Sequence, residues 1–477
     1  MTEKTKQIST KDKVAYGLGD MGNGIAMQIV GSYLFFFMTT ILHIPSYIAG
    51  LAVGVSIVWD AVTDPIMGYI SDNTKSRRFG RRHIYLIIGM IGVALTIIGL
   101  FFIPIDSSLT LKVSLIFILI ILYKTFITIL VTPFTALGAE LSSDYHERTR
   151  IQSIRSVFYM LGIALSMVAG MYIFFQPNAK YPVGQLNPEA YKNMAIVTAI
   201  GTVILISIAF RATRKYIPRL NQHLIFKTND KMSSKIFSTF LNTMKNKAFA
   251  LIALSYMFNN IATAFVNIIG LHVFTYTFGF SNTEFSIIIG LQFFFSILSQ
   301  PLWMYLVHEM DKKKCVLLAL SITIGISMYF VLLAVFNRQV ESQIIYFIPY
   351  AIFAGIGTGA LFTIPASMVA DTIDLEELET GIRTEGVYFG SMTFFYKLAQ
   401  SITVFIIGGL LTFIGFNSHL SVQSPDTRLY LGLILGFGVA ISMLLSYWSI
   451  SKYTLTKESI LSIQAKLQAK ALEAPQD

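Results

Sequence analysis

Apolar runs long enough to cross a membrane as helices recur along the whole chain of 477 residues, and this feature constrains the fold most strongly. A helix of about 20 residues spans a hydrocarbon core of about 30 Å. Charged residues make up only 13% of the chain, about half their share in a soluble globular protein. We therefore predict an all-α integral membrane protein with helices at 13–42, 46–71, 83–105, 111–142, 151–175, 191–213, 247–277, 281–307, 313–336, 342–370, 386–415 and 427–452.

Basic residues gather in every second connection between these predicted helices. The basic connections hold Lys75, Arg77, Arg78, Arg81 and Arg82, then Arg148 and Arg150, the segment 211–247, and Lys312, Lys313 and Lys314. Cytoplasmic loops carry an excess of Lys and Arg, so we expect both termini in the cytoplasm. The expected location is the plasma membrane, the inner membrane of a bacterium. The formal charge of +10 then reflects orientation in the bilayer, and we expect no nucleic acid partner.

A long polar connection divides the chain into two halves of six predicted helices each. We expect an N-terminal bundle at 1–213, a cytoplasmic middle loop at 214–246, a C-terminal bundle at 247–453 and a cytoplasmic tail at 454–477. This layout resembles that of the major facilitator superfamily, in which the two halves are parallel repeats about an axis along the membrane normal.

The two halves share traces of a repeat but differ in charge. The second helix carries Asp64-Pro65-Ile66-Met67-Gly68-Tyr69, and the eighth carries Gln300-Pro301-Leu302-Trp303-Met304-Tyr305 at the matching place. Where the second helix has Asp60 and Asp64, the eighth has Ser296 and Gln300. A function that needs two carboxylates here therefore belongs to the N-terminal half.

The aspartates Asp60 and Asp64 lie four residues apart in the second predicted helix. Residues at this spacing share one face of a helix, so two ionised carboxylates there repel each other. In a low dielectric such a pair is stable only with a cation between the carboxylates or a proton on one of them. This spacing predicts a site for Na⁺ or H⁺. The hydroxyl groups of Thr63 and of Thr128, in the fourth helix, are expected to complete the oxygen ligands.

Other ionisable residues inside predicted spans are functional candidates, because a charge at the bilayer centre costs about 2.5 to 17 kcal/mol. A sugar both donates and accepts hydrogen bonds, so Asp20, Arg155 and Lys397 together suit such a ligand. The alternatives are that Arg155 or Lys397 merely pairs with the two helix 2 aspartates, or that Arg155 reaches for the membrane surface. Lys124 is interpreted as mainly structural, reaching the outer part of its helix or an ion pair.

The loop after the second helix contains Asp72 and the run Lys75-Ser76-Arg77-Arg78-Phe79-Gly80-Arg81-Arg82. One hypothesis makes Asp72 and Arg78 a gate, in which the carboxylate holds a basic partner in the outward-open state and releases it as the halves rock. The alternative is a solvated loop that only sets the orientation of the chain in the membrane.

Three segments resemble the glycoside/pentoside/hexuronide:cation symporters of the major facilitator superfamily, typified by melibiose permease. They are Tyr16-Gly17-Leu18-Gly19-Asp20, Trp59-Asp60-Ala61-Val62-Thr63-Asp64-Pro65-Ile66-Met67-Gly68 and Ser76-Arg77-Arg78-Phe79-Gly80-Arg81-Arg82. The resemblance spans most of the chain. It implies twelve transmembrane helices in two bundles and symport of a sugar or glycoside with Na⁺ or H⁺ by alternating access.

The resemblance also implies roles for single residues. The coupling cation would bind at Asp60 and Asp64, with Thr63 and Thr128 lining the same site. Sugar binding or its coupling would involve Asp20, Arg155, Thr393 and Lys397. The sequence departs from the disaccharide-transporting pattern at Val131 and Thr135, beside Pro133-Phe134, and at Gly19 in place of a lysine. These departures put a galactoside substrate in doubt and leave the cation site intact.

Two other classes of function are weighed against this hypothesis. Related eukaryotic carriers of lysophospholipids keep the helix 2 aspartates, and the uncharged Val131 is compatible with such an amphipathic lipid. An enzyme is not expected, because the chain lacks the Gly-x-Ser-x-Gly, His-Glu-x-x-His and phosphate-binding glycine motifs. No cofactor is expected beyond the coupling ion. The expected partners are a small sugar, a monovalent cation and the lipid bilayer, and each chain is expected to function as a monomer.

Overall fold

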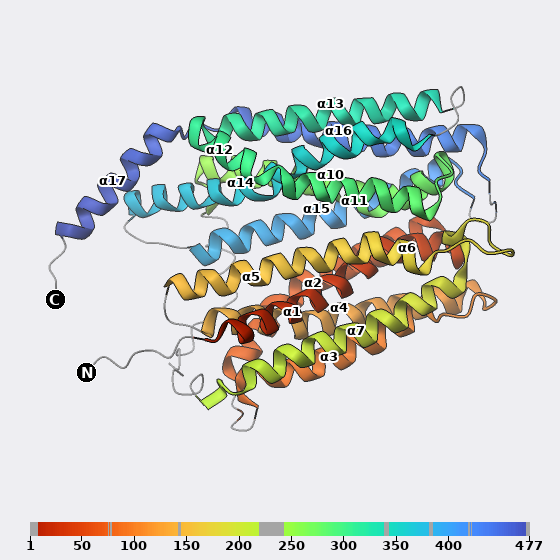
Figure 1. The fold of residues 1–477 in the computed structure, drawn as a ribbon, viewed down its shortest axis with the longest axis horizontal. Coiled ribbons are helices and arrows are strands. Elements are labelled where there is room, and N and C mark those ends of the chain that lie inside the picture. Colours follow the sequence, from red (N-terminus) through yellow and green to blue (C-terminus); the bar gives the residue numbers. More distant parts are fainter. Residues whose placement is uncertain are drawn as a thin grey trace. The chain divides into compact units, whose positions relative to one another are not determined.

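The computed structural model describes residues 8–74, 76, 79–141, 145–218, 243–337, 343–380, 385–417, 420 and 422–473. Within these residues, twelve helices are long and apolar enough to cross a membrane, which confirms the predicted all-α membrane architecture (Figure 1). The chain forms two compact units. The first comprises residues 1–227, 280–286 and 405–423, and the second comprises 228–279, 287–404 and 424–477. The expected boundaries at 213 and 247 stay a prediction.

The helices of the N-terminal half begin and end within a few residues of the predicted spans, except that α5 begins six residues earlier. They are α1 (Thr10–Phe36, continued by a π-helical turn Phe37–Ile41), α2 (Ser46–Asn73), α3 (Gly80–Phe101), α4 (Leu109–Glu140), α5 (Tyr145–Ala164, continued by a π-helical turn Leu165–Ala169), α6 (Gly170–Phe174) and α7 (Pro188–Arg214). α1 packs against α5 and α7, and α4 packs against α2 and α3. These crossings place the ionisable residues of four helices inside one unit.

In the described part of the C-terminal half, six segments are long and apolar enough to span a membrane. Its helices are α10 (Lys247–His272, continued by a π-helical turn Val273–Thr277), α11 (Asn282–Leu298), α12 (Gln300–Glu309), α13 (Lys312–Phe336), α14 (Ile348–Thr380), α15 (Glu385–Phe413), α16 (Pro425–Ser451) and α17 (Lys457–Glu473). α16 packs against α10 and α13, and α14 packs against α13 and α17. The span predicted at 281–307 is divided between α11 and α12, with Pro301 near the start of α12, where proline is tolerated.

Close helix crossings depend on residues without a side chain. A Cβ atom at Gly162 of α5 would lie 2.4 Å from the Met21 carbonyl oxygen of α1, and one at Gly89 of α3 would lie 2.8 Å from the Leu130 backbone nitrogen of α4. Small residues let helix backbones approach closely inside membranes. These contacts fix α1 against α5 and α3 against α4. Of these four helices, α1, α4 and α5 carry candidate site residues.

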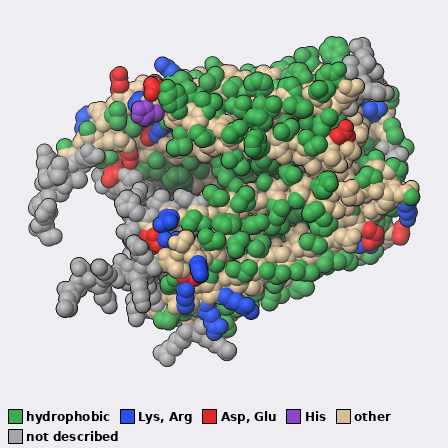
Figure 2. All heavy atoms as spheres, viewed as in Figure 1, with side chains coloured by type: hydrophobic (Ala, Val, Ile, Leu, Met, Phe, Trp, Pro, Cys, Tyr) green, Lys and Arg blue, Asp and Glu red, His purple; other side chains and the backbone are tan. Residues whose placement is uncertain are grey.

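Apolar side chains cover the outside of the helices. On the face drawn in Figure 2, hydrophobic groups cover the lengths of the helices, while Lys, Arg, Asp and Glu gather toward their ends. Ile88, Ile91 and Leu95 of α3, for example, are all exposed and share one face at helical spacing. This distribution is the one that a lipid environment favours.

The predicted end of the tenth span at residue 370 is wrong, because α14 continues to Thr380. The extension carries Asp371, which is buried and accepts hydrogen bonds of 2.7 and 2.8 Å from Lys312 of α13. Asp374, further along the same helix, accepts one of 3.1 Å from Gln464 of α17. Contacts with neighbouring helices therefore keep this polar segment helical beyond its apolar run.

Candidate functional site

The centre of the candidate site is a hydroxyl group between two carboxylates. Thr128 Oγ1 of α4 lies 2.8 Å from Asp60 Oδ1 and 2.9 Å from Asp64 Oδ1 of α2. Asp60 and Asp64 are one helical turn apart and face α4, as their spacing predicts. The structure thus brings together three of the four residues predicted to bind the coupling cation.

The pairing of α2 with α4 is fixed beside the carboxylates by an indole. Trp59 Nε1 donates a 2.9 Å hydrogen bond to Thr125 Oγ1. Trp59 directly precedes Asp60, and Thr125 lies three residues before Thr128 on α4. This contact adds a second hydrogen bond between α2 and α4, beside those that Thr128 makes with the carboxylates.

The number of protons available constrains this arrangement. A hydroxyl group carries one proton, so Thr128 donates to Asp60 or to Asp64 at any moment, but not to both. The other contact is favourable only when that carboxyl group carries a proton or when a cation lies among the three oxygen atoms. Carboxylate and hydroxyl oxygens are suitable ligands for a small hard cation. The positions of these three oxygen atoms are therefore compatible with the predicted site for Na⁺ or H⁺.

The fourth predicted ligand, Thr63, has a different partner. Its hydroxyl group donates to the backbone carbonyl of Asp60 at 3.3 Å, the usual local bond of a threonine inside a helix. When the hydroxyl group donates its proton, the lone pairs of its oxygen atom remain available. The role of Thr63 as a cation ligand stays a prediction.

The sequence interpretation left the partner of Lys124 open, and the structure identifies it. Lys124 Nζ of α4 lies 3.7 Å from Asp60 Oδ2. This ion pair differs from the expected alternative, in which the aspartates pair with Arg155 or Lys397. Lys124 and Thr128 are four residues apart, so both reach α2 from one face of α4. That spacing was the sequence signal that would have found this pair.

A second polar cluster joins α1 to α5. Arg155 Nε lies 3.1 Å from Asp20 Oδ2, and Asn23 Nδ2 donates a 2.9 Å hydrogen bond to Asp20 Oδ1. Asp20 and Asn23 are buried. Arg155 Nη1 is also buried and has no hydrogen-bond partner among the residues that the structure describes. Arg155 is therefore paired inside the bundle rather than extended to the membrane surface.

Two predicted substrate residues, Thr393 and Lys397, lie one helical turn apart on α15. The Thr393 hydroxyl donates to the Phe389 carbonyl at 3.2 Å and the residue is exposed, while Lys397 is half-buried. Both residues belong to the second unit, whereas Asp20 and Arg155 belong to the first. Their part in a common substrate site stays a prediction.

The predicted gate falls partly outside the described residues. This applies to all of Arg78 and to the side chain of Asp72, whose backbone forms part of α2. The structure shows another cluster at this end of the first unit: Glu140 Oε1 lies 2.7 Å from Arg82 Nη2 and 2.8 Å from Arg81 Nη2. Arg82 Nη1 also donates to Ser71 Oγ at 2.5 Å. The sequence interpretation assigned no role to this cluster, which ties α2, α3 and α4 together.

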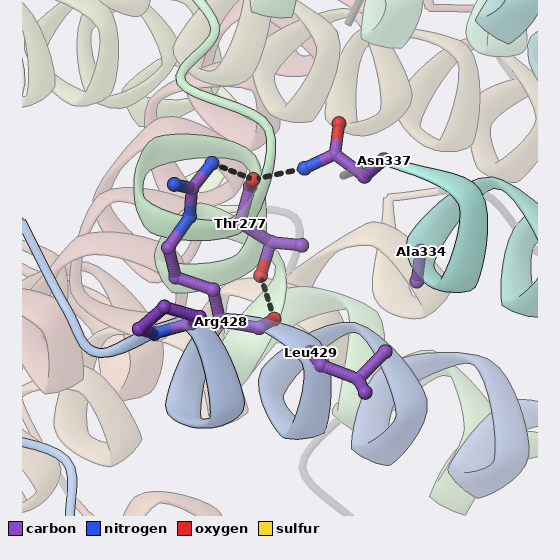
Figure 3. Close-up of a pocket in the computed structure, with 6 residues that line it drawn as sticks. Thr277, Ala334, Asn337, Arg428 and Leu429 are labelled. Atoms are coloured by element: carbon purple, nitrogen blue, oxygen red, sulfur yellow. Dashed lines mark hydrogen bonds between the residues drawn. The ribbon is translucent and has the colours of Figure 1, made fainter. Parts of the chain in front are cut away.

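A pocket lies in the second unit. It is lined by Thr277, Ala334, Asn337, Pro425, Arg428 and Leu429. Arg428 Nη2 and Asn337 Nδ2 both donate to the Thr277 carbonyl, at 3.1 and 2.6 Å, and the Thr277 hydroxyl donates to the Arg428 carbonyl at 2.8 Å (Figure 3). Carbonyl groups at the end of a helix need such partners, so these polar groups have a structural role at the end of the π-helical turn that continues α10.

Three proteins of similar sequence are each described as a symporter. The chain is 26% identical to an uncharacterised symporter of Bacillus subtilis, over 98% of this chain and 97% of the relative. It is 24% identical to an inner membrane symporter of Escherichia coli, over 97% and 96%. It is 22% identical to the sodium-dependent lysophosphatidylcholine symporter 1 of Gallus gallus, over 91% and 84%.

Solved structures agree on the fold. A D-xylose–proton symporter superposes with a TM-score of 0.64 at 15% identity, over 94% of this chain and 98% of the other. This similarity confirms the predicted major facilitator superfamily fold. The model of the MFS/sugar transport protein family matches residues 15–457, nearly the whole chain. The protein is thus a multi-pass membrane transporter rather than an enzyme, and it belongs to the MFS/sugar transport family, the melibiose permease-like cation symporters of the major facilitator superfamily.

Proposed function

We propose that this protein moves a sugar or glycoside across the membrane together with one monovalent cation, Na⁺ or H⁺. The observation that carries this proposal is the Thr128 hydroxyl between Asp60 and Asp64, at 2.8 and 2.9 Å. Like charges at this spacing need a cation or a proton for stability inside a membrane. The family description as sugar transport proteins supports the class of substrate.

The charges of the first unit support a single coupling ion. Its two polar clusters contain three carboxylates, on Asp20, Asp60 and Asp64, and two basic groups, on Lys124 and Arg155. When all five are ionised, their net charge is minus one, which one monovalent cation neutralises. Because uncompensated charge is costly inside a bilayer, we expect one cation for each transport cycle.

The Asp20 and Arg155 cluster is the proposed first half of the substrate site. A carboxylate accepts hydrogen bonds from sugar hydroxyls and a guanidinium group donates to them. Arg155 Nη1, which has no hydrogen-bond partner in the described part of the chain, supplies such a donor. Thr393 and Lys397 of α15 are proposed as further substrate-binding residues.

The proposed cycle couples the two sites through charge. Cation binding neutralises the Asp60 and Asp64 pair and favours substrate binding, and the loaded protein then alternates between outward- and inward-facing forms around a site near the midplane. This coupling is reciprocal, so the substrate tightens cation binding by the same factor. Asp72 and Arg78 remain the proposed gate.

Transport of an amphipathic lipid such as a lysophospholipid is the second candidate function. Similarity to a sodium-dependent lysophosphatidylcholine symporter over most of both chains favours it. Val131 is half-buried on α4 between Thr128 and Pro133. It is apolar where the sequence pattern of disaccharide transporters has a charged residue, and an apolar side chain there is compatible with a lipid substrate. The same cation site serves either substrate.

Uptake into proteoliposomes tests this proposal. Labelled glycosides, pentosides, hexuronides and a lysophospholipid are supplied with an inward Na⁺ gradient, an inward H⁺ gradient or neither. We expect one sugar class to accumulate only with a gradient, and Asp64→Asn to abolish accumulation, whereas Asp106→Asn, at an exposed position, leaves it intact. Equal uptake with and without gradients would contradict symport, and gradient-driven uptake of only the lipid would favour the second candidate.

Orientation and assembly are also proposed. The charge pattern supports cytoplasmic termini, and an E. coli relative described as an inner membrane symporter supports the inner membrane of a bacterium as the location. A single chain contains both bundles, so we propose that the monomer is the functional unit.

A further inference from the structure

Lys124 faces the carboxylate pair from the helix that also supplies Thr128. Its ammonium group is 3.7 Å from Asp60 Oδ2, and the two side chains are 20% and 13% exposed. Thr128 contacts the other oxygen of the same carboxylate, Asp60 Oδ1, at 2.8 Å. Asp60 therefore interacts with a protein cation through one oxygen atom and with the proposed ion site through the other.

The geometry of this contact differs from that of a buried, hydrogen-bonded ion pair with only a structural role. At 3.7 Å the nitrogen and oxygen atoms attract each other as charges but lie beyond normal hydrogen-bond length. Both side chains also retain some exposure. A lysine ammonium group is a compact charge on a flexible four-carbon stem, so it can withdraw from Asp60 without moving α4.

An ammonium group and a coupling ion compete electrostatically for one carboxylate. Each carries one positive charge, and like charges in a weakly screened site repel. A cation that enters between Asp60 and Asp64 meets the Lys124 charge close by. The positive charge of Lys124 therefore lowers the affinity of the site for any added cation, as long as the ammonium group remains near Asp60.

We propose that Lys124 acts as a tethered cation that sets the affinity of the ion site and selects among coupling ions. The inference rests on the proposed cation-coupled function. It adds a role for Lys124, which is not among the predicted cation ligands. In the ion-free protein Lys124 stabilises the charge of Asp60, and the coupling ion binds in competition with it. Removal of the positive charge makes the site bind Na⁺ and Li⁺ more tightly, at the expense of stability in the ion-free state.

The test is calorimetric titration of Na⁺ and Li⁺ into the purified full-length protein, without sugar. Lys124→Gln and Lys124→Met remove the charge with side chains of similar length, and Lys124→Arg keeps it. Lys112→Gln is the matched control: Lys112 lies on the same helix, is 8% exposed and donates to the Leu42 carbonyl at 3.1 Å, not to a carboxylate. We expect at least tenfold tighter binding, about 1.4 kcal/mol, in the two neutral variants only.

The competing explanation makes Lys124 a structural partner of Asp60. In that case a neutral variant that still unfolds cooperatively would bind Na⁺ with unchanged or lower affinity, and this result would overturn the proposal. Two neutral variants keep the test valid if one of them does not fold. Failure of the proposed function has a different signature, because wild-type uptake would then be independent of every cation gradient, whatever the ion affinity of the variants.

Discussion

The Thr128 hydroxyl is the smallest feature on which the candidate ion site depends. It is buried and is the one group on α4 that lies within hydrogen-bond distance of both Asp60 and Asp64 among the described residues. A hydrogen bond to a charged group contributes about 1.5 to 3 kcal/mol. Loss of this hydroxyl should therefore weaken cation binding without removing either carboxylate.

We predict that Thr128→Val lowers the apparent affinity for the coupling cation by about 10- to 100-fold, because about 1.4 kcal/mol corresponds to a factor of ten. Thr128→Ser, which keeps the hydroxyl group, should remain within a few-fold of wild type. The measurement is the cation concentration that gives half-maximal uptake. Equal values for the valine and serine variants would show that the hydroxyl does not contact the ion.

At the scale of single residues, the sequence predicted the positions of the carboxylates better than it predicted the side chains that contact them. The spacing of Asp60 and Asp64 alone predicted a shared helix face, because that face depends only on helical geometry. The ion pair of Lys124 with Asp60 was not predicted, although the spacing of Lys124 from Thr128 placed both on one face of α4. The spacing indicates the shared face, but the contact itself depends on how α4 rotates against α2. The sequence grouped Asp20 and Arg155 with Lys397 as candidates for a polar ligand. The structure pairs Asp20 with Arg155, and the contribution of Asn23 was missed.

At the scale of helices, close packing of α1 against α5 positions the proposed substrate residues. Asp20 lies on α1 and Arg155 on α5, and their ion pair of 3.1 Å requires these helices to touch. Gly162 allows this contact, since its place opposite the Met21 carbonyl leaves no room for a side chain. The proposed substrate cluster of Asp20 and Arg155 therefore depends on a glycine, a residue without a polar side chain.

We predict that Gly162→Ala destabilises the protein by about 1 to 3 kcal/mol, the usual cost of overpacking, and also lowers substrate uptake. Gly201→Ala on α7 is the matched control, because a Cβ atom there meets nothing within 4 Å. Alanine is the better helix former by about 1 kcal/mol, so this control should be neutral or stabilising. Apparent melting temperatures in detergent measure both effects. Equal losses in the two variants would contradict the packing argument.

Most helices were predicted from the sequence because apolar length is a local property. The end of α14 was not, since the residues after 370 are polar. Asp371 there is buried through its contact with Lys312, and Asp374 binds Gln464 of α17. Contacts between distant parts of the chain, rather than hydropathy, decide where this helix ends.

At the scale of the whole molecule, charge distinguishes the two halves. The proposed ion site lies entirely in the first unit, on α2 and α4, while the matching positions of the C-terminal half are Ser296 and Gln300. Polar contacts of another kind recur at related places: Glu140 at the end of α4 pairs with Arg82 of α3, and Asp371 near the end of α14 pairs with Lys312 of α13. Both halves thus contain structural ion pairs, whereas at the positions of Asp60 and Asp64 the C-terminal half has no carboxylate.

Coupling of substrate to one cation is the central claim, and it has an electrical consequence. A neutral sugar that moves with one Na⁺ or H⁺ carries one net charge across the membrane, whichever ion is used. The most direct measurement is the current evoked by a transported neutral sugar in proteoliposomes adsorbed to a solid-supported membrane. We predict a transient inward current in wild type and in Asp106→Asn, and none in Asp64→Asn. Sugar uptake by the wild-type protein without any current would contradict the account.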